Sequence, residues 1–335
     1  MTTPPPAANT PAPQQPLILG TMGWTDPDRA RAALHASLEA GMRVLDTADI
    51  YGAGASERTV GALLAELDAE SRAGLRVQTK AGIVLDELDA AGRPEVRYDS
   101  SPAHLRAALE RSLDRLGADC VDILLVHRPD VLTPVARTVR AFLDAREAGL
   151  VRRLGVSNLG TGRVLEFQRE LARQGRDGTG LACVQMELGL HHRTLVEAFV
   201  LPNHPTAPAT AGAADLGAVC AGEGIELQAW GPLGQGRFST APPAPDALVP
   251  DPEGGAATLG GTAAVVAQVA QELAVGPEAV VLAWLLKLPW QVRPVVGTQR
   301  PERIAACAQA PDAAARMSAR QWYRLWTAAR GHALP

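Results

Sequence analysis

Short apolar segments and longer amphipathic segments alternate along almost the whole chain. The short segments are rich in Val, Leu, Ile and Thr, and some, such as VDILLVH, are apolar at nearly every position. Continuous apolar runs of this length are typical of parallel strands that are buried on both faces. We predict eight strands, near residues 17–20, 43–48, 76–81, 121–127, 152–157, 182–188, 226–230 and 292–297.

The longer segments show helical spacing. Leu105, Leu109 and Leu113 recur on one face of such a segment, and Ser101 before Pro102 has the pattern of a helix start, with a serine cap and proline at the first helical position. We predict helices at residues 28–40, 56–67, 102–116, 135–148, 162–172, 213–221, about 262–287 and 301–309.

Eight strand-then-helix units predict an α/β fold, a single (β/α)₈ TIM barrel, because a barrel of this kind needs about 250 residues. A doubly wound open sheet is the alternative, but no GxGxxG motif follows the first strand. We expect a disordered Pro/Ala-rich lead at 1–16, the barrel at 17–330 and a tail at 331–335. The Pro- and Gly-rich stretches 201–214 and 239–262 are too long for ordinary barrel loops, and we expect extended loops at the rim or disorder there.

Composition excludes several classes of function. The 335-residue chain has a formal net charge of −4, which gives no basic footprint for nucleic acid. It has no apolar run long enough for a transmembrane helix, and its first residues lack the basic and apolar regions of a signal peptide. The four cysteines are far apart and form no CxxC pair, so neither a disulfide framework nor a structural zinc site is indicated. We expect a cytoplasmic protein.

Candidate chemistry gathers at the ends of three consecutive predicted strands. Asp46 ends the second strand and Tyr51 follows in the loop; Lys80 ends the third strand and His127 the fourth. Neighbouring strands lie about 4.8 Å apart, so these groups fit within about 10 Å of one another at the mouth of a barrel. Lys80 is one of only two lysines among 32 basic residues, and Tyr51 is one of three tyrosines.

This set of side chains is suited to proton transfer to an oxygen that gains negative charge. We expect the Lys80 ammonium to lower the pKa of the Tyr51 phenol, Asp46 to keep Lys80 protonated, and His127 to orient a carbonyl oxygen. None of the four is a free covalent nucleophile, so a bound hydride donor is the natural source of electrons. Taken singly, each residue also has an ordinary structural interpretation as a cap, a loop aromatic, a surface charge or a core histidine.

At these residues the sequence resembles the aldo-keto reductase superfamily, from about residue 17 to residue 329. The motifs LDTADIYG, QTKAG, VDILLVHRPD, GLVRRLGVSN, AWGPLGQG and PVVGTQRPERI occur in the family's order. The resemblance implies a barrel that uses NADPH (NADP⁺) as cofactor without a Rossmann domain, with a catalytic tetrad of Asp46, Tyr51, Lys80 and His127 in which Tyr51 is the general acid. The chain is most similar to the bacterial oxidoreductase branch, which carries HRPD after the fourth strand and Trp after the seventh.

The resemblance also implies the residues that hold the cofactor. Ser157, Asn158 and Gln185 would bind the nicotinamide carboxamide, and Trp230 would stack on the nicotinamide ring. The remaining cofactor positions are Thr21, Met22, Gly231, Pro232, Leu233, Gly236, Thr298 and Arg303, and Trp24 is a candidate for the substrate pocket. Gly231, Gly297, Ala306 and Cys307 depart from residues found in relatives, so a preference for NADPH would depend mainly on Arg303, with Thr298 and Arg300.

Three functions are weighed on this basis. The first is NADPH-dependent reduction of a small-molecule aldehyde or ketone to an alcohol. The second is a cofactor-binding regulatory subunit, as in the potassium-channel β subunits that resemble the same family. The third is a Schiff-base aldolase that uses Lys80, which leaves the PVVGTQRPERI segment without a role. The tandem His191-His192 lacks a carboxylate pattern, so we expect no metal. Neither the substrate nor the oligomeric state can be read from the sequence.

Overall fold

The computed structural model describes residues 15–89, 92–175, 179–202, 215–238 and 256–335. Eight parallel strands form a closed barrel in the order β1, β2, β3, β6, β7, β8, β9 and β10, with β10 pairing back to β1. The barrel strands are β1 (Ile18–Gly20), β2 (Val44–Asp46), β3 (Arg76–Ala81), β6 (Val121–Val126), β7 (Val151–Ser157), β8 (Cys183–Glu187), β9 (Glu226–Trp230) and β10 (Arg293–Val296). The predicted TIM barrel and its eight strands are confirmed.

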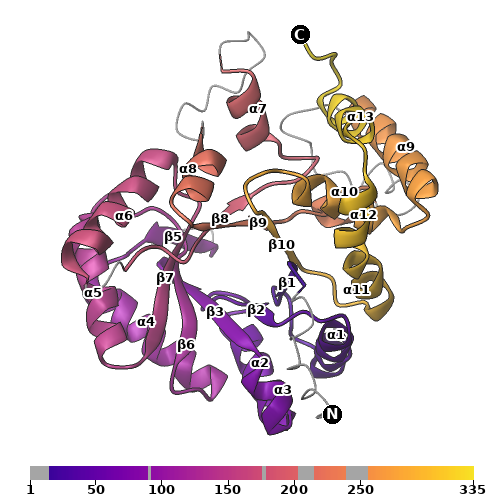
Figure 1. Cartoon of the computed structure of the whole chain (residues 1–335). Coiled ribbons are helices and arrows are strands. Elements are labelled where there is room, and N and C mark those ends of the chain that lie inside the picture. The colour runs from indigo at the N-terminus through magenta and orange to yellow at the C-terminus, as the bar shows by residue number, and fades with distance from the viewer. Residues whose placement is uncertain (1–14, 90–91, 176–178, 203–214, 239–255) are drawn as a thin grey trace, which may run out of the picture.

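Helices surround the barrel (Figure 1). One helix follows each strand at the predicted place: α1 (Pro27–Glu39), α2 (Ala55–Glu66), α4 (Pro102–Leu116), α5 (Val135–Glu147), α6 (Thr161–Gln174), α8 (Leu216–Gly222), α10 (Pro277–Leu286) and α11 (Pro301–Ala308). Further helical segments are α3 (Ala69–Ala73), α7 (Thr194–Val200), α9 (Ala256–Leu273), α12 (Ala310–Arg316), α13 (Ala319–Arg330) and the short 3₁₀ turn η1 (Gly234–Gly236).

Helix α4 shows why these segments fold as they do. The Ser101 hydroxyl accepts a hydrogen bond from the His104 amide at the start, and Gly117 adopts a left-handed conformation at the end. Its apolar face, with Leu105 and Leu109, is buried against the barrel. Burying each leucine contributes about 2 kcal/mol of transfer free energy, so packing of this face is what fixes the helix on the sheet.

The region predicted as one helix near 262–287 consists of two helices. The segments Gly261–Leu273 and Pro277–Leu286 meet at an angle of 91°. Gly276 and Pro277 lie at the break, since proline cannot continue the preceding helix and is well accommodated at the start of the next one. Helix α10 is buried on every side because it lies between the barrel, α9 and α12.

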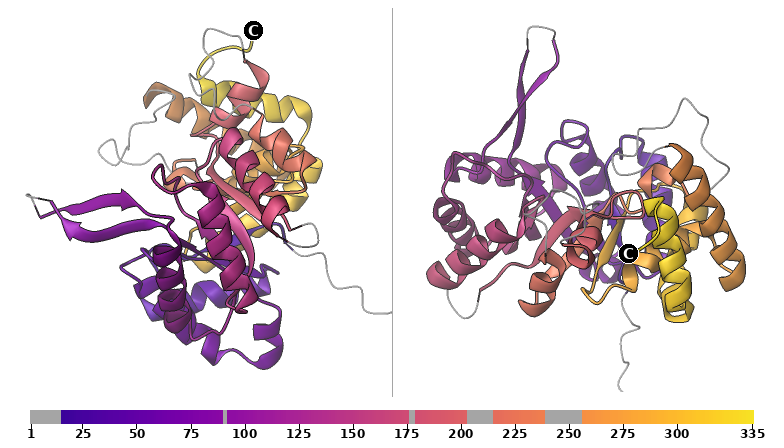
Figure 2. Two further views of the ribbon diagram at one scale, coloured as in Figure 1. Left: turned by 90° about the vertical axis from the view of Figure 1, so that its left-hand side faces the viewer. Right: turned by 90° about the horizontal axis from the view of Figure 1, so that it is seen from above.

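An antiparallel hairpin, which the sequence did not predict, follows the strand that carries Lys80. It consists of β4 (Ile83–Leu88) and β5 (Pro94–Tyr98), and it projects well beyond the barrel (Figure 2). Leu88, Val96 and Tyr98 are exposed on it. Since strand β3 ends at the mouth of the barrel, the hairpin extends outward from the rim where the candidate residues lie.

Several expectations fall on parts of the chain that the structure does not describe. These are most of the 1–16 lead, the stretch 203–214, which includes the first residues of the helix predicted at 213–221, and residues 239–255. In the described part, no single helix is long and apolar enough to cross a membrane, although the bent pair of 261–273 and 277–286 passes that test jointly.

Candidate active site

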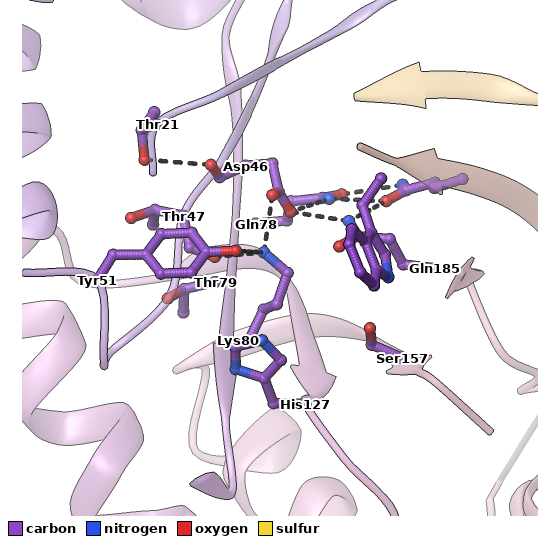
Figure 3. A network of polar contacts seen from close by, with 12 residues as sticks. Thr21, Asp46, Thr47, Tyr51, Gln78, Thr79, Lys80, His127, Ser157 and Gln185 are labelled. Atoms are coloured by element: carbon purple, nitrogen blue, oxygen red, sulfur yellow. Dashed lines mark hydrogen bonds and ion pairs between the residues drawn. The ribbon is translucent and has the colours of Figure 1, made fainter. Parts of the chain in front are cut away.

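The four predicted reactive residues meet at the C-terminal end of the barrel (Figure 3). Asp46 is the last residue of β2, Lys80 lies one residue before the end of β3, and His127 directly follows β6. Backbone hydrogen bonds hold these ends in register: the Asp49 amide donates to the Lys80 carbonyl at 3.1 Å, and the His127 amide donates to the Ala81 carbonyl at 2.9 Å. The parallel barrel thus places three side chains of distant sequence origin around one point.

Lys80 is the centre of this cluster. Its ammonium donates to Asp46 Oδ2 at 2.7 Å, to the Thr47 carbonyl at 2.9 Å and to the Tyr51 hydroxyl at 3.2 Å. The side chain is 1 % exposed. Burial opposes the charge, but the neighbouring Asp46 and Tyr51 oxygens raise the pKa of Lys80 above its ordinary value. Lys80 is therefore a cation over the whole neutral range, with an acceptor for each of its three N–H bonds.

Tyr51 differs from the expectation in one respect. Burial raises the pKa of its phenol above the ordinary value; Lys80 acts to lower that pKa, but the carboxylates of Asp46 and Asp49 partly cancel its effect. Lys80 thus acts on the pKa of Tyr51 in the expected direction, but burial outweighs its effect. The phenol keeps its proton at neutral pH, which is the state that a proton donor needs.

His127 is a neutral imidazole. Burial, aided by the positive charges of Lys80 and Arg128, lowers the pKa of His127 to about 3. Its ring meets the Tyr51 ring edge-on at a centroid distance of 6.2 Å. Buried Nδ1 has no hydrogen-bond partner among the described residues. A neutral imidazole beside a protonated phenol provides a second donor for an oxygen placed between them.

The loop that carries Tyr51 is fixed from the neighbouring helices. Glu57 is completely buried, accepts a hydrogen bond from the Thr79 hydroxyl at 2.7 Å, and pairs with Arg115 of α4 at 3.0 Å. Arg115 also donates to the Asp49 carbonyl in the loop at 3.2 Å. Burial and the nearby Glu57 raise the pKa of Asp49 to about 7. These contacts set the position of the phenol.

The residues expected to bind a nicotinamide ring gather beside this cluster. Asn158, in a left-handed conformation with φ of 61°, donates to the His127 carbonyl and to the Ser157 hydroxyl, and it accepts from the Trp230 indole at 3.1 Å. Gln185 donates to Asp46 Oδ1 at 2.9 Å. Its Oε1 has no hydrogen-bond partner in the described part of the chain. The amide of Asn158 thus orients Trp230, and the Gln185 oxygen is the acceptor left for a ligand.

The glycine-rich loop after β9 makes a sharp turn. Gly231, Gly234 and Gly236 all have positive φ, and a Cβ on Gly234 would lie 2.9 Å from the ring of His191. Gly231 is exposed and Pro232 is buried, and the amides of Gly234 and Gly236 donate within the turn to the carbonyls of Gly231 and Leu233, at 2.9 Å each. His191 itself packs against this loop and lies 3.4 Å from Glu187. The described residues contain no cluster of three or more His, Cys, Asp or Glu that could hold a metal ion.

The predicted cofactor positions after the first and the last strand differ in their exposure and in their partners. Thr21 is buried and donates to the Asp46 carbonyl at 3.1 Å, whereas Met22 is 70 % exposed. Thr298 accepts a hydrogen bond from the Arg300 amide at the start of α11. Arg303 pairs with the buried Glu278 at 2.9 Å, so part of its charge is already balanced.

Trp24 lies in the hydrophobic core. Its side chain is 0 % exposed, so in this structure it packs within the core and lines no open surface.

Sequence reasoning missed two residues of the site. Gln78 and Gln228 lie inside the barrel on β3 and β9, and Gln78 donates to Asp46 Oδ1 at 2.6 Å. Gln78 lies two positions before Lys80 in RVQTK, and Gln228 lies two positions before Trp230 in ELQAW, so each points to the same face of its strand as that site residue. That position was the available signal.

Comparisons with known proteins agree with this geometry. The model of the aldo/keto reductase family matches residues 16–326. A 6-dehydroglucose reductase from Novosphingobium aromaticivorans is 32 % identical over 329 residues, which cover 95 % of this chain and 90 % of the relative. Another 6-dehydroglucose reductase, from Agrobacterium fabrum, is 31 % identical over 93 % of the chain and 92 % of the relative. The solved structure of a glycerol dehydrogenase from Gluconobacter oxydans has the same fold, with a TM-score of 0.72 at 24 % identity, and the match covers 98 % of this chain and 94 % of the other.

Proposed function

Because the chain belongs to the aldo/keto reductase family and is an oxidoreductase, we propose that it reduces an aldehyde or ketone to an alcohol with NADPH as hydride donor. The observation that carries the proposal is the arrangement of the Lys80 ammonium between Asp46 and the Tyr51 hydroxyl. This arrangement places a permanent positive charge next to a phenol whose burial keeps its proton on it.

The donor set fits a nicotinamide cofactor. The Gln185 oxygen is an acceptor with no partner among the described residues, the indole of Trp230 is held in place by Asn158, and Gly231 at the turn after β9 is exposed. Ser157, Asn158 and Gln185 would hold the carboxamide end, and Trp230 would lie against the ring. The bound cofactor supplies the hydride.

The 2′-phosphate of NADPH would bind at the start of α11. An anion is favoured at a helix N-terminus, and Thr298 supplies a hydroxyl there. Arg300 caps this helix and its side chain makes no ion pair with the described residues, whereas Arg303 is paired with Glu278. We therefore assign the larger part of a preference for NADPH over NADH to Arg300.

The side chains of the cluster divide the proton chemistry among them. Tyr51 Oη holds the proton that goes to the carbonyl oxygen as that oxygen gains charge. Lys80 stabilises the phenolate that Tyr51 leaves behind, and Asp46 keeps Lys80 charged. Neutral His127 donates a hydrogen bond to the same oxygen and orients it. Burial of the cluster excludes water from these charges and strengthens their interactions.

Sugar aldehydes are the finer substrate class that we propose. Two relatives at 31–32 % identity are named 6-dehydroglucose reductase, and each match spans nearly the whole chain. A sugar with an oxidised terminal carbon would present its aldehyde to Tyr51.

The test is NADPH oxidation by the purified protein with a panel of carbonyls that includes 6-dehydroglucose, simple aldehydes and ketones. We expect oxidation that depends on the carbonyl, fastest with the sugar aldehyde. Tight binding of NADPH without turnover over the whole panel would contradict the proposal and favour a cofactor-binding regulatory subunit.

A further inference from the structure

Three buried glutamines cross the interior of the barrel. They are Gln78 on β3, Gln185 on β8 and Gln228 on β9, each 2 % exposed or less. They lie between two carboxylates, Asp46 at the C-terminal end of β2 and Glu226 at the N-terminal end of β9. Buried amide N–H groups in such number need acceptors, because each unpaired polar group would cost about 1–3 kcal/mol.

All six amide N–H bonds of the three glutamines have acceptors. Nε2 of Gln78 donates to Asp46 Oδ1 at 2.6 Å and to Gln228 Oε1 at 2.8 Å. Nε2 of Gln185 donates to the same two oxygens, at 2.9 Å each. Nε2 of Gln228 donates to Gln78 Oε1 at 3.0 Å and to Glu226 Oε1 at 2.7 Å. The network is continuous from one end of the barrel to the other.

The direction of these bonds is set by the two carboxylates. An ionised carboxylate only accepts, so Gln228 must turn its NH₂ toward Glu226 and its oxygen toward the other two amides. If the Gln228 amide were reversed, its oxygen would face Glu226 and its NH₂ would face two other NH₂ groups. The orientation of Gln228 at Glu226 therefore favours the arrangement in which Gln78 and Gln185 turn their NH₂ groups toward Asp46. Figure 3 shows Gln78 and Gln185 together with Asp46.

We propose that Glu226 is a positioning residue: through the amide of Gln228 it fixes the direction of the hydrogen bonds that reach Asp46. The inference rests on the proposed function, since its effect on turnover acts through Asp46 and Lys80. Two N–H donors on Oδ1 stabilise the Asp46 anion in a dry interior, and that anion in turn keeps the Lys80 ammonium charged. Reversed amides would place an oxygen against Asp46 Oδ1 and favour its protonation.

The far end of the network is open to solvent. Glu226 lines a hollow of about 610 Å³ together with Arg153 and Arg293, and its side chain is 30 % exposed. Arg293 donates to Glu226 Oε2 at 2.9 Å, which leaves Oε1 for Gln228. A change at this end therefore reaches the catalytic carboxylate without touching substrate or cofactor.

Glu226→Gln is the diagnostic variant, because it keeps the size of the side chain but removes the acceptor-only carboxylate. The charged and titratable groups near Asp46 are Lys80, Tyr51 and the Cys183 thiol. Those near Glu226 are Arg293, Arg153 and the same thiol. Because the variant stabilises the Asp46 anion less, Lys80 loses its proton at a lower pH. We expect the alkaline limb of the pH profile of kcat/KM to move down by about 1 pH unit. General damage to the fold would lower the active fraction without moving the limb.

Arg293→Gln is the matched control, since it removes the ion pair but leaves Glu226 an acceptor-only group. Its alkaline limb should coincide with that of the wild type. A wild-type limb in Glu226→Gln, or an equal shift in both variants, would overturn the proposal.

A second measurement does not depend on activity. Glu226 and Gln78 share no hydrogen bond, so their substitutions should affect unfolding independently unless Gln228 couples them. In a denaturant double-mutant cycle of Glu226→Gln with Gln78→Met, we expect the unfolding constants to depart from additivity by fivefold or more. The cycle of Arg293→Gln with Gln78→Met should be additive.

Additivity in the first cycle would contradict the proposed coupling of Glu226 to Gln78 through Gln228. If the wild type showed no NADPH oxidation, the proposed function would fail, but the cycle would still test this coupling.

Discussion

At the scale of single residues, the two lysines of the chain occupy opposite environments. Lys80 is 1 % exposed and donates to three oxygens, whereas Lys287 is exposed at the end of α10. Arginine supplies the other thirty basic positions. A compact ammonium fits between Asp46 and Tyr51, and a broad planar guanidinium does not.

Lys80→Arg should therefore lower kcat by about 100-fold or more, because the phenol loses the point charge that stabilises its phenolate. Lys287→Arg is the matched control and should leave kcat unchanged. Both variants can be compared in the same steady-state assay with circular dichroism as a check of folding. Normal turnover in Lys80→Arg would show that the scarcity of lysine reflects composition alone.

His127 gives a prediction for stability. Because its pKa falls from 6.5 to about 3 on folding, the unfolded chain binds a proton in this range that the folded chain does not. The stabilisation is complete above about pH 6.5 and declines as the pH falls toward 3. Between pH 7.5 and pH 5.0 the loss is about 2 kcal/mol.

Urea unfolding at several pH values checks this prediction. His127→Asn should have a free energy of unfolding that falls less steeply with decreasing pH than that of the wild type. His35→Asn, at an exposed position of α1, is the control. Parallel pH dependence in His127→Asn and the wild type would show that His127 accepts a proton in the folded protein as readily as in the unfolded one.

The sequence predicts the identity of the reactive residues better than their environment. That Asp46, Tyr51, Lys80 and His127 lie together could be predicted because strand ends are visible in the hydrophobic pattern. The raised pKa of Tyr51 could not, because it depends on how fully the loop covers the phenol and on Asp49, which no pattern placed nearby. Gln78 and Gln228 were missed because their role depends on the hydrogen bonds that they form with each other across the barrel.

At the scale of elements, the loop between β2 and α2 depends on α4, the helix of the next strand–helix unit. Arg115 of α4 pairs with the buried Glu57 and holds the Asp49 carbonyl. Gly54 is required at this contact: it has φ of 82°, and a Cβ there would lie 2.5 Å from the Arg115 guanidinium.

Arg115→Met should destabilise the protein by about 3 kcal/mol, since it leaves a buried carboxylate without its cation. It should also lower kcat, because the loop that positions Tyr51 loses its anchor. Arg106→Met on the same helix removes an exposed pair with Glu110 and should change the free energy of unfolding little. Equal denaturation midpoints for the two variants would contradict the role given to Arg115.

Elements with regular periodicity could be predicted, and the exceptions have physical reasons. The break between α9 and α10 occurs at Gly276-Pro277, and it was missed because apolar residues continue on both sides of it. The hairpin β4–β5 was missed because apolar residues such as Leu88, Val96 and Tyr98 are exposed on it and its charged residues have the composition of a loop. Helix α13 lies beyond the eighth unit and packs on α9, so the barrel pattern did not require it.

At the scale of the whole molecule, the two ends of the barrel hold different groups of charged residues. The C-terminal ends of the strands hold the proposed catalytic cluster, and the N-terminal end holds the Glu226–Arg293 pair. Eight alternating units were enough to predict closure, because parallel strands need both faces and both edges covered. The family relationship and the closed barrel agree with that prediction.

The central claim is that Tyr51 donates the proton in carbonyl reduction. Tyr51→Phe removes the hydroxyl and keeps the ring, so it tests this claim most directly when single-turnover NADPH oxidation is measured alongside NADPH binding. We predict a rate lower by about 1,000-fold with a dissociation constant for NADPH within about threefold of the wild type. A single-turnover rate for Tyr51→Phe equal to that of the wild type would contradict the account.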